Sequence, residues 1–135
     1  MIRIFLDTNV LISATFWYGS ANKVIISISK KKISAFTTNQ ILDEYRKVIK
    51  RDFNHSEEEA DERIAKLLEV LEIVSPSETV NFIKDDPSDN KVLEGALEAS
   101  AGYILTYDAK HLLKIKEFKG IKIISPEEFL KLCEV

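Results

Sequence analysis

The sequence "IRIFLDTNVLISA" occupies residues 2–14 and contains a single acidic residue, Asp7, between two apolar segments. The five residues before Asp7 are mostly aliphatic or aromatic and predict a buried β-strand. Asp, Thr and Asn commonly form turns and begin helices, so "DTN" predicts a junction from strand to helix. A carboxylate at a strand end also suits a functional site. The role of Asp7 therefore depends on which other acidic residues the fold brings to it.

Composition favours one globular domain, residues 1–135, because 45% of the residues are hydrophobic and 30% are charged. The sequence has no apolar run of transmembrane length and no pattern typical of a secretory signal. Its single cysteine, Cys133, cannot form an internal disulfide, which is consistent with a reducing compartment. We therefore expect a cytoplasmic protein without a membrane partner.

The net charge of −3 bears on possible partners. Proteins that hold nucleic acid through many phosphate contacts usually carry a basic excess, and this chain does not. A nucleic-acid substrate would have to meet a local basic patch or a bound cation that reverses the local charge. The basic residues within 46–51 predict a solvent-exposed helix face that could contact a phosphate backbone beside such a site.

Short apolar runs alternate with segments of helical periodicity along the whole chain. Predicted strands cover 2–6, 33–37, 103–106 and 121–124, with a further short strand at 72–75. Predicted helices cover 10–20, 20–30, 39–51, 56–71, 86–101, 109–115 and 126–133. This alternation predicts a three-layer α/β/α sandwich with a central parallel sheet of about four to five strands. Ligands of such sheets bind beyond the carboxyl ends of the strands.

Two aspartates follow predicted strands on that ligand side. Asp7 comes directly after the strand at 2–6, and Asp108 follows the strand at 103–106 after one intervening residue, Tyr107. Each could instead cap the helix that follows it. Position alone leaves the structural and the functional role open for both.

Asp89 lies at the centre of the apolar stripe predicted for the helix at 86–101. At about 100° per residue, the apolar side chains of this helix fall within roughly 80° of one line, which passes through Asp89. Glu94 and Glu98 fall on the opposite face. Asp89 could close a capping box with Asp86, with Pro87 in the first helical position. This role is compatible with an inward-facing functional carboxylate.

The helix at 39–51 carries two adjacent acids with different expected directions. Glu44 falls at the border of its apolar stripe and can reach a shared site, whereas Asp43 falls opposite the stripe and is expected to face away. The two histidines, His55 and His111, show no arrangement typical of a catalytic triad or a zinc site.

The segments "FLDTNVLISA", "ILDEY", "DPSDNKVLEGAL" and "YILTYD" together resemble the PIN-domain family of nucleases, in the family's order and over essentially the whole chain. Among its subfamilies, the chain is most similar to compact prokaryotic VapC-like toxin components of toxin–antitoxin pairs. The resemblance assigns the family's four acids to Asp7, Glu44, Asp89 and Asp108. Two positions depart from the family pattern: Tyr107 replaces a small or polar residue, and His111 stands where relatives often carry an acid.

This resemblance implies a ribonuclease that cleaves RNA phosphodiester bonds and leaves 5′-phosphate and 3′-hydroxyl ends. Asp7 and Asp89 would be the principal metal ligands, and Asp108 and Glu44 would complete or support a second metal position. Asn9 and Thr106 would orient carboxylates and waters. The resemblance further implies a homodimer and an antitoxin protein as partner.

Electrostatics gives an independent reason to expect a metal. Two unit charges about 6 Å apart at an effective dielectric of about 20 repel by roughly 3 kcal/mol, so four clustered acids must take up protons or cations. Oxygen ligands favour Mg²⁺ or Mn²⁺, and the lack of nearby Cys and His argues against zinc.

Two alternatives to a ribonuclease remain open. One is a catalytically inactive PIN-fold protein that acts as an RNA- or protein-binding module. The other is a different α/β enzyme with an acidic site, such as a phosphatase. A second Asp two residues after Asp7 would support a phosphatase, but that residue is Asn9.

Overall fold

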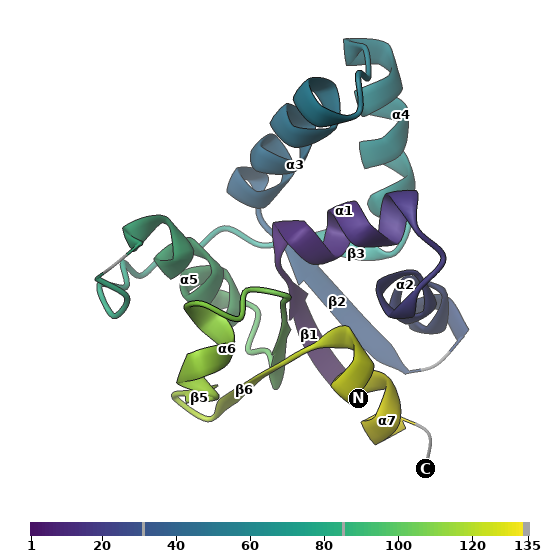
Figure 1. Ribbon diagram of the computed structural model, residues 1–135. Helices are drawn as coiled ribbons and strands as arrows, with labels where there is room; N and C mark the ends of the chain where they lie inside the picture. The colour runs from purple at the N-terminus through teal and green to yellow at the C-terminus, as the bar shows by residue number, and fades with distance from the viewer. Residues whose placement is uncertain (31, 85, 134–135) are drawn as a thin grey trace.

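The computed structural model describes residues 1–30, 32–84 and 86–133, and its centre is a six-stranded sheet (Figure 1). The strand order is β3-β2-β1-β4-β6-β5. The strands are β1 (Ile2–Leu6), β2 (Ile33–Thr37), β3 (Leu71–Ile73), β4 (Tyr103–Leu105), β5 (Glu117–Phe118) and β6 (Ile121–Ile124). Every neighbouring pair is parallel except β5 and β6. The predicted α/β class is confirmed.

The central parallel sheet predicted with about four to five strands is present, and the structure adds one strand that was not predicted, β5. This strand pairs antiparallel with β6 across a tight turn, and both turn residues have positive φ, 49° at Lys119 and 84° at Gly120. Such turns match the twist of a hairpin. A strand of two residues is too short to show an alternating pattern, so the sequence gives little sign of it.

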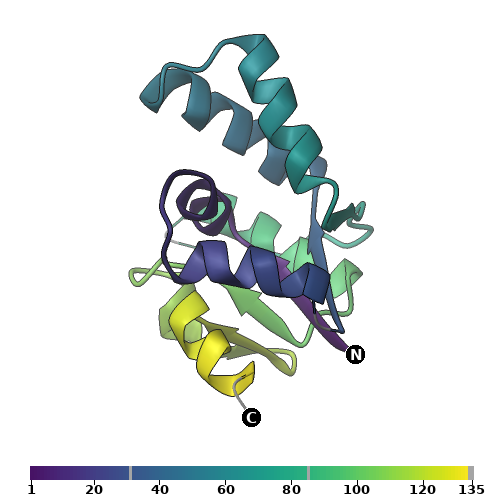
Figure 2. The same ribbon diagram turned by 90° about the vertical axis from the view of Figure 1, so that its right-hand side faces the viewer.

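Helices cover both faces of the sheet, which makes the three layers visible in Figures 1 and 2. On one face, α2 packs against β2 and α7, and α1 packs against α2; on the other, α5 contacts β1, β2 and β4, and α6 contacts β6. A hairpin of α3 and α4 extends beyond one end of the sheet. The helices are α1 (Thr8–Phe16), α2 (Ser20–Lys30), α3 (Asn39–Asp52), α4 (Glu57–Leu67), α5 (Asn90–Glu98), α6 (Leu112–Ile115) and α7 (Pro126–Cys133).

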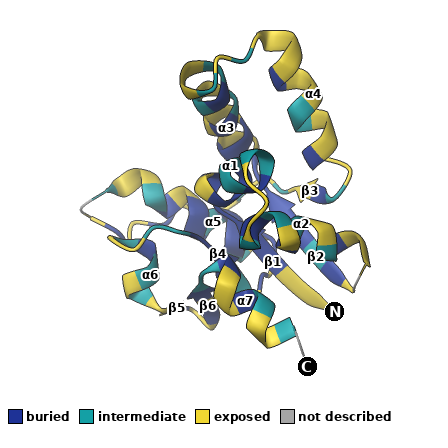
Figure 3. Cartoon of the chain, turned by 45° about the vertical axis from the view of Figure 1, so that its right-hand side comes forward, coloured by how far each residue is buried: buried dark blue, intermediate teal, exposed yellow. Residues whose placement is uncertain are grey.

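Burial on both faces explains why β1 is apolar throughout its second half. Ile4, Phe5 and Leu6 are completely buried, and Figure 3 shows the buried strands enclosed by helices whose outer faces are exposed. Parallel strands covered on both sides require such continuous apolar runs. None of the helices in the described part of the chain is both long and apolar enough to span a membrane.

The helix predicted at 86–101 begins differently from expectation. A 3₁₀ turn, η1 (Pro87–Asp89), precedes α5, and Asp86 caps this turn by accepting a hydrogen bond from the Ser88 N–H. Asp89 therefore lies at the junction of η1 and α5, and its side chain makes no capping hydrogen bond there. Because its carboxylate is not used to cap α5, it remains available to other groups.

Candidate functional site

Asp7 lies at the carboxyl end of β1, beside the carboxyl end of the neighbouring strand β4. It caps α1 by accepting a hydrogen bond of 2.7 Å from the Thr8 N–H, so the predicted junction from strand to helix is present. Its other oxygen, Oδ2, accepts a bond of 2.7 Å from Thr106 Oγ1. Asp7 is only 8% exposed, which is unusual for a carboxylate that forms no ion pair with any basic residue the structure describes.

The loop after β4 is held by two further side chains. Thr106 Oγ1 accepts a hydrogen bond of 3.0 Å from the Asp108 N–H, and Asn9 Oδ1 accepts one of 3.1 Å from the Tyr107 N–H. Thr106 thus contacts the predicted ligand Asp7 directly. Asn9 contacts the backbone of the loop, so in this structure it fixes the loop that carries Asp108.

Three of the four predicted acids, Asp7, Glu44 and Asp89, line one cleft of about 450 Å³. They come from the end of β1, from α3 and from the start of α5. Asp43 lines the same cleft, so the expectation that it faces away is wrong. The reason is that the cleft is open to solvent and is bordered by the exposed face of α3, not only by the edge of its apolar stripe.

Asp108 approaches the site from a different side and is not among the described residues that line the cleft. Its carboxylate accepts hydrogen bonds from the backbone N–H groups of Lys110, His111 and Leu112. Asp108 therefore caps the turn that leads into α6, which is the structural role considered for it from its position after a strand. Its charge still reaches the site, because it raises the pKa of both Asp7 and Asp89.

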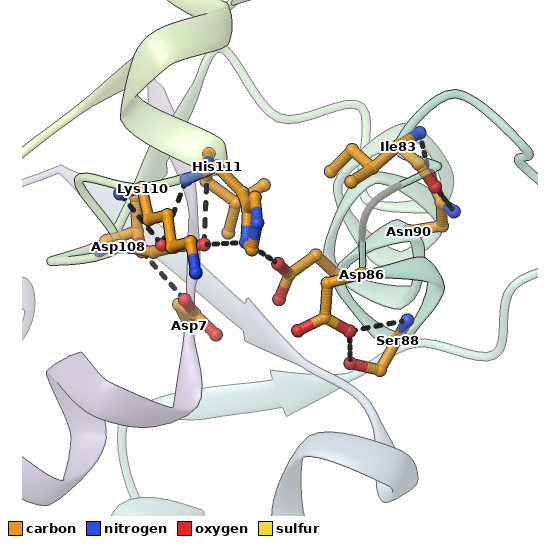
Figure 4. Close-up of polar contacts among 11 residues, drawn as sticks. Asp7, Ile83, Asp86, Ser88, Asn90, Asp108, Lys110 and His111 are labelled. Carbon is orange, nitrogen blue, oxygen red and sulfur yellow. Dashed lines mark hydrogen bonds and ion pairs between the residues drawn. The ribbon is translucent and has the colours of Figure 1, made fainter.

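His111 lies between the acids, which the sequence did not indicate. Its Nδ1 is 3.1 Å from Asp89 Oδ2 and 3.8 Å from Asp108 Oδ2. Figure 4 shows the imidazole between Asp108 on one side and Asp86 on the other. The sequence showed no arrangement of His111 typical of a triad or a zinc site, but the turn capped by Asp108 brings His111 back over the start of α5, where it contacts Asp89.

Asp86, Asp89 and His111 form a group that could hold a cation. Each offers a ligand atom, and these three atoms lie within 4.8 Å of one another. A mixed carboxylate and imidazole donor set suits Mn²⁺ and other transition metals better than Mg²⁺. The argument against zinc assumed that no histidine lies near the acids. His111 lies beside Asp89, so that argument does not apply to this position.

Burial and mutual repulsion raise the pKa of the two most central acids. The pKa of Asp7 is raised from 3.8 to about 6, mainly by burial, with Glu44 and Asp108 adding to the rise and the bonds from Thr106 and Thr8 opposing it. The pKa of Asp89 is also raised to about 6, by burial and by its acidic neighbours Asp108, Asp86 and Asp7. Burial and repulsion both disfavour the ionised form of these carboxyl groups. A bound cation would offset this cost, so the site favours positive charge.

Residues 3–110, which include all four acids and most of the sheet, match the family model described as PIN domain. The chain belongs to the PIN-domain family. Comparison with curated protein sequences gives no match. The catalytic and metal-binding roles of Asp7, Glu44, Asp89 and Asp108 in this PIN domain stay predictions.

Two solved structures share the fold of this PIN domain at 15% sequence identity each. The crystal structure of VapBC2 from Rickettsia felis, bound to a DNA fragment from their promoter, has a TM-score of 0.61, with 90% of this chain and 97% of that chain covered. The crystal structure of Mycobacterium tuberculosis VapC20, a Sarcin-Ricin loop cleaving toxin, has a TM-score of 0.59, with 88% and 98% covered. At this identity the likeness concerns the fold.

Sequence reasoning overlooked two members of the site in this PIN domain, Asp86 and His111. Asp86 was interpreted only as a helix cap, although its spacing of three residues from Asp89 places both on adjacent turns of a helix start. His111 follows Asp108 by the same spacing. Local spacing therefore gave a signal for each, but the contact between the two segments depends on the tertiary fold.

Proposed function

We propose that this protein is a metal-dependent ribonuclease that hydrolyses RNA phosphodiester bonds and acts as the toxin of a toxin–antitoxin pair. The observation that carries the proposal is the cleft in which Asp7, Glu44 and Asp89 meet, with the pKa of Asp7 and Asp89 raised to about 6. Family membership and the shared fold with VapC20, described as a Sarcin-Ricin loop cleaving toxin, support it.

The donor set fits a divalent cation. Asp7, Glu44 and Asp89 supply oxygen donors on one cleft, and Asp86 and His111 supply further donors beside Asp89. We propose Mg²⁺ or Mn²⁺ held by Asp7 and Asp89, with Glu44 and Asp108 supporting a second position. When bound, the cation lowers the pKa of a water and offsets the negative charge of the phosphate.

The protein's own side chains prepare this site before any substrate arrives. Thr106 and the Thr8 N–H hold the two oxygens of Asp7 in a fixed orientation. Asp108 fixes the turn that carries His111, and His111 in turn contacts Asp89. Each of these contacts reduces the rearrangement needed when a phosphate enters the cleft.

We also propose the partners and location that the family resemblance implies, namely an antitoxin protein, a second copy of the chain in a homodimer, and the cytoplasm. The shared fold with VapBC2 supports the antitoxin part of this proposal. Copurification with the product of a neighbouring gene and measurement of the mass in solution would test the two partners.

Cleavage assays with an Asp7→Asn variant test the activity. We expect the wild-type protein to cut defined RNAs in Mg²⁺ or Mn²⁺ but not in chelator, and Asp7→Asn to abolish cutting without loss of the fold. Asp52→Asn is the matched control, because Asp52 lies at the exposed end of α3 and pairs with Arg51. Unchanged cleavage by pure Asp7→Asn protein would contradict the assignment.

The same assay separates the alternatives. RNA binding by the wild-type protein without cleavage in any metal would favour a catalytically inactive PIN-fold binding module. Release of free phosphate from a small ester would favour a phosphatase.

A further inference from the structure

A second pocket of about 340 Å³ lies beside the carboxylate cleft, between the segment that precedes η1 and helix α6. Its lining includes Phe82, Lys84, Lys110, His111 and Lys114, and we call these five residues the basic pocket. Five acids and two lysines are among the residues that line the first cleft, which we call the carboxylate cleft, whereas the described lining of the basic pocket contains three lysines and no acid. The two therefore differ sharply in charge although they adjoin.

The lysines of the basic pocket are available to bind an anion. Within residues 1–30, 32–84 and 86–133, neither Lys84, Lys110 nor Lys114 forms an ion pair. All three are exposed at the surface. Three lysines that form no ion pair with any described residue are notable in a chain whose net charge is −3.

The basic face predicted within 46–51 is less available. Arg46 pairs with Glu57 at 3.0 Å and with Asp61 at 2.8 Å, and Lys50 also pairs with Glu57. Two of its four charges thus join α3 to α4, and a third, Arg51, pairs with Asp52 at the end of α3. The basic pocket is consequently the better candidate for phosphate contacts.

Phe82 adds an aromatic surface to the basic pocket. Phe82 is 55% exposed, and its ring packs on one side against Phe118, with ring centroids 5.1 Å apart. An exposed aromatic ring beside cations is the usual means by which proteins bind single-stranded nucleic acid, because every base can stack on it.

Asn90 fixes the backbone that presents this ring. Its Oδ1 accepts hydrogen bonds of 3.1 Å and 2.8 Å from the N–H groups of Phe82 and Ile83, and its Nδ2 donates one of 2.8 Å to the Ile83 carbonyl. Asn90 is only 4% exposed, so these bonds are shielded from water. Figure 4 shows the hydrogen bonds between Asn90 and Ile83.

The basic pocket continues directly into the carboxylate cleft. His111 lines the basic pocket, and its Nδ1 is 3.1 Å from Asp89, which lines the cleft. Lys110 is close enough to Asp86 to lower the pKa of that carboxyl. A strand whose scissile phosphate enters the cleft would therefore place a neighbouring nucleotide over the basic pocket.

We propose that the basic pocket binds a nucleotide of single-stranded RNA next to the one that is cleaved. Phe82 stacks on its base, and Lys84, Lys110 and Lys114 contact its phosphates. This inference rests on the proposed ribonuclease function. It favours RNA over an acidic peptide because a peptide carboxylate would use the lysines but leave the aromatic face without a matching group.

Binding of a fluorescein-labelled single-stranded RNA 8-mer of randomised sequence, measured by anisotropy in EDTA, tests the proposal without cleavage. We expect the triple change Lys84→Ala, Lys110→Ala and Lys114→Ala to weaken binding by at least about tenfold and to reduce the salt slope of log affinity by about 2, at roughly 0.7 per phosphate contact. The matched control changes Lys23, Lys30 and Lys131 to Ala, which removes the same charge from exposed positions on α2 and α7.

Substitutions of Phe82 test the stacking contact. Phe82→Leu keeps an apolar side chain and should weaken binding about tenfold, whereas Phe82→Trp should retain it, since only an aromatic ring stacks on a base. Melting temperatures would check that each variant is folded.

Three results would overturn the proposal: equal weakening by the control triple, unchanged binding by Phe82→Leu, or competition by polyglutamate as effective as that by unlabelled RNA. Because binding is measured in EDTA, a wild-type protein that fails to cleave RNA would refute the ribonuclease function separately.

Discussion

Thr106 Oγ1 donates a hydrogen bond of 2.7 Å to Asp7 Oδ2 and so joins the end of β4 to the end of β1. The same oxygen accepts a bond of 3.0 Å from the Asp108 N–H. One completely buried hydroxyl thus sets the orientation of Asp7 and the course of the chain at Asp108. The two strand-end aspartates are therefore positioned together.

Changing Thr106 to Val tests this coupling, because Val keeps the branched shape and loses both hydrogen bonds. The bond from Thr106 lowers the pKa of Asp7, so its loss should raise that pKa above about 6 and weaken cation binding at neutral pH. We expect RNA cleavage to fall about 10- to 100-fold, as for other partners of metal ligands, and unfolding to be easier by about 1 kcal/mol. Thr106→Ser, which keeps the hydroxyl, should stay close to wild type in both measurements.

The raised pKa values of Asp7 and Asp89 predict an unusual pH dependence of stability. Because both values are about 6 in the folded protein against 3.8 for the free side chain, the folded state binds more protons between these values. The stabilising contribution is thus fully present below about pH 4 and is lost as the pH rises through about 6.

Urea unfolding of the metal-free protein at pH 5 and pH 7.5 measures this effect. We expect the free energy of unfolding to fall between these pH values by about 1.4 kcal/mol more in the wild type than in Asp7→Asn, because Asp7 titrates over about one pKa unit of this range and one unit corresponds to about 1.4 kcal/mol. Equal slopes for the two proteins would show that Asp7 does not titrate in this range.

Replacing His111 by Ala should affect the binding of Mn²⁺ and of Mg²⁺ to different extents. Both Mg²⁺ and Mn²⁺ are expected to raise the melting temperature at pH 7.5, because either offsets the repulsion among the acids. Imidazole binds Mn²⁺ more readily than Mg²⁺, so loss of the His111 ring should reduce the Mn²⁺ shift more than the Mg²⁺ shift. The corresponding change at His55, which bonds to the Phe53 carbonyl on the α3–α4 hairpin, should alter neither shift. Equal reduction for both ions would argue against His111 as a ligand.

Among the glycines, Gly95 is the position at which adding a methyl group should destabilise the protein most. A Cβ atom there would lie 2.4 Å from Phe5 Cζ and 3.0 Å from Thr38 Cγ2, and the Phe5 ring is completely buried. We expect Gly95→Ala to destabilise the protein by about 1–3 kcal/mol through overpacking, despite the higher helix propensity of Ala. Gly102→Ala is the control, since its nearest neighbour would be 3.8 Å away, in ordinary contact. Thermal unfolding of both variants provides the comparison.

The fold was largely predictable because its signals are local. The capping box of Ser56 and Glu59 begins α4 at the start of the helix predicted at 56–71, and the apolar run at 2–6 forms a central strand. Boundaries were less accurate: α4 ends at Leu67, and the following strand begins at Leu71, inside the predicted helix.

The site was only partly predictable because its members meet through tertiary contacts. Strand ends brought Asp7 to the ligand side of the sheet, as the parallel topology requires. Helical periodicity could not show that α3 borders an open cleft, which is why Asp43 was misplaced. Nor could it show that a turn returns His111 to Asp89.

Asp89 and Asn90 are adjacent, yet one belongs to the carboxylate cleft and the other anchors the backbone of Phe82. Successive side chains at a helix start point in directions about 100° apart, so one turn of the chain can contribute both to the carboxylate cleft and to the basic pocket. Any displacement of that turn moves both. If the proposed cation binds at Asp89, we therefore expect its binding to shift the backbone that carries Phe82 as well.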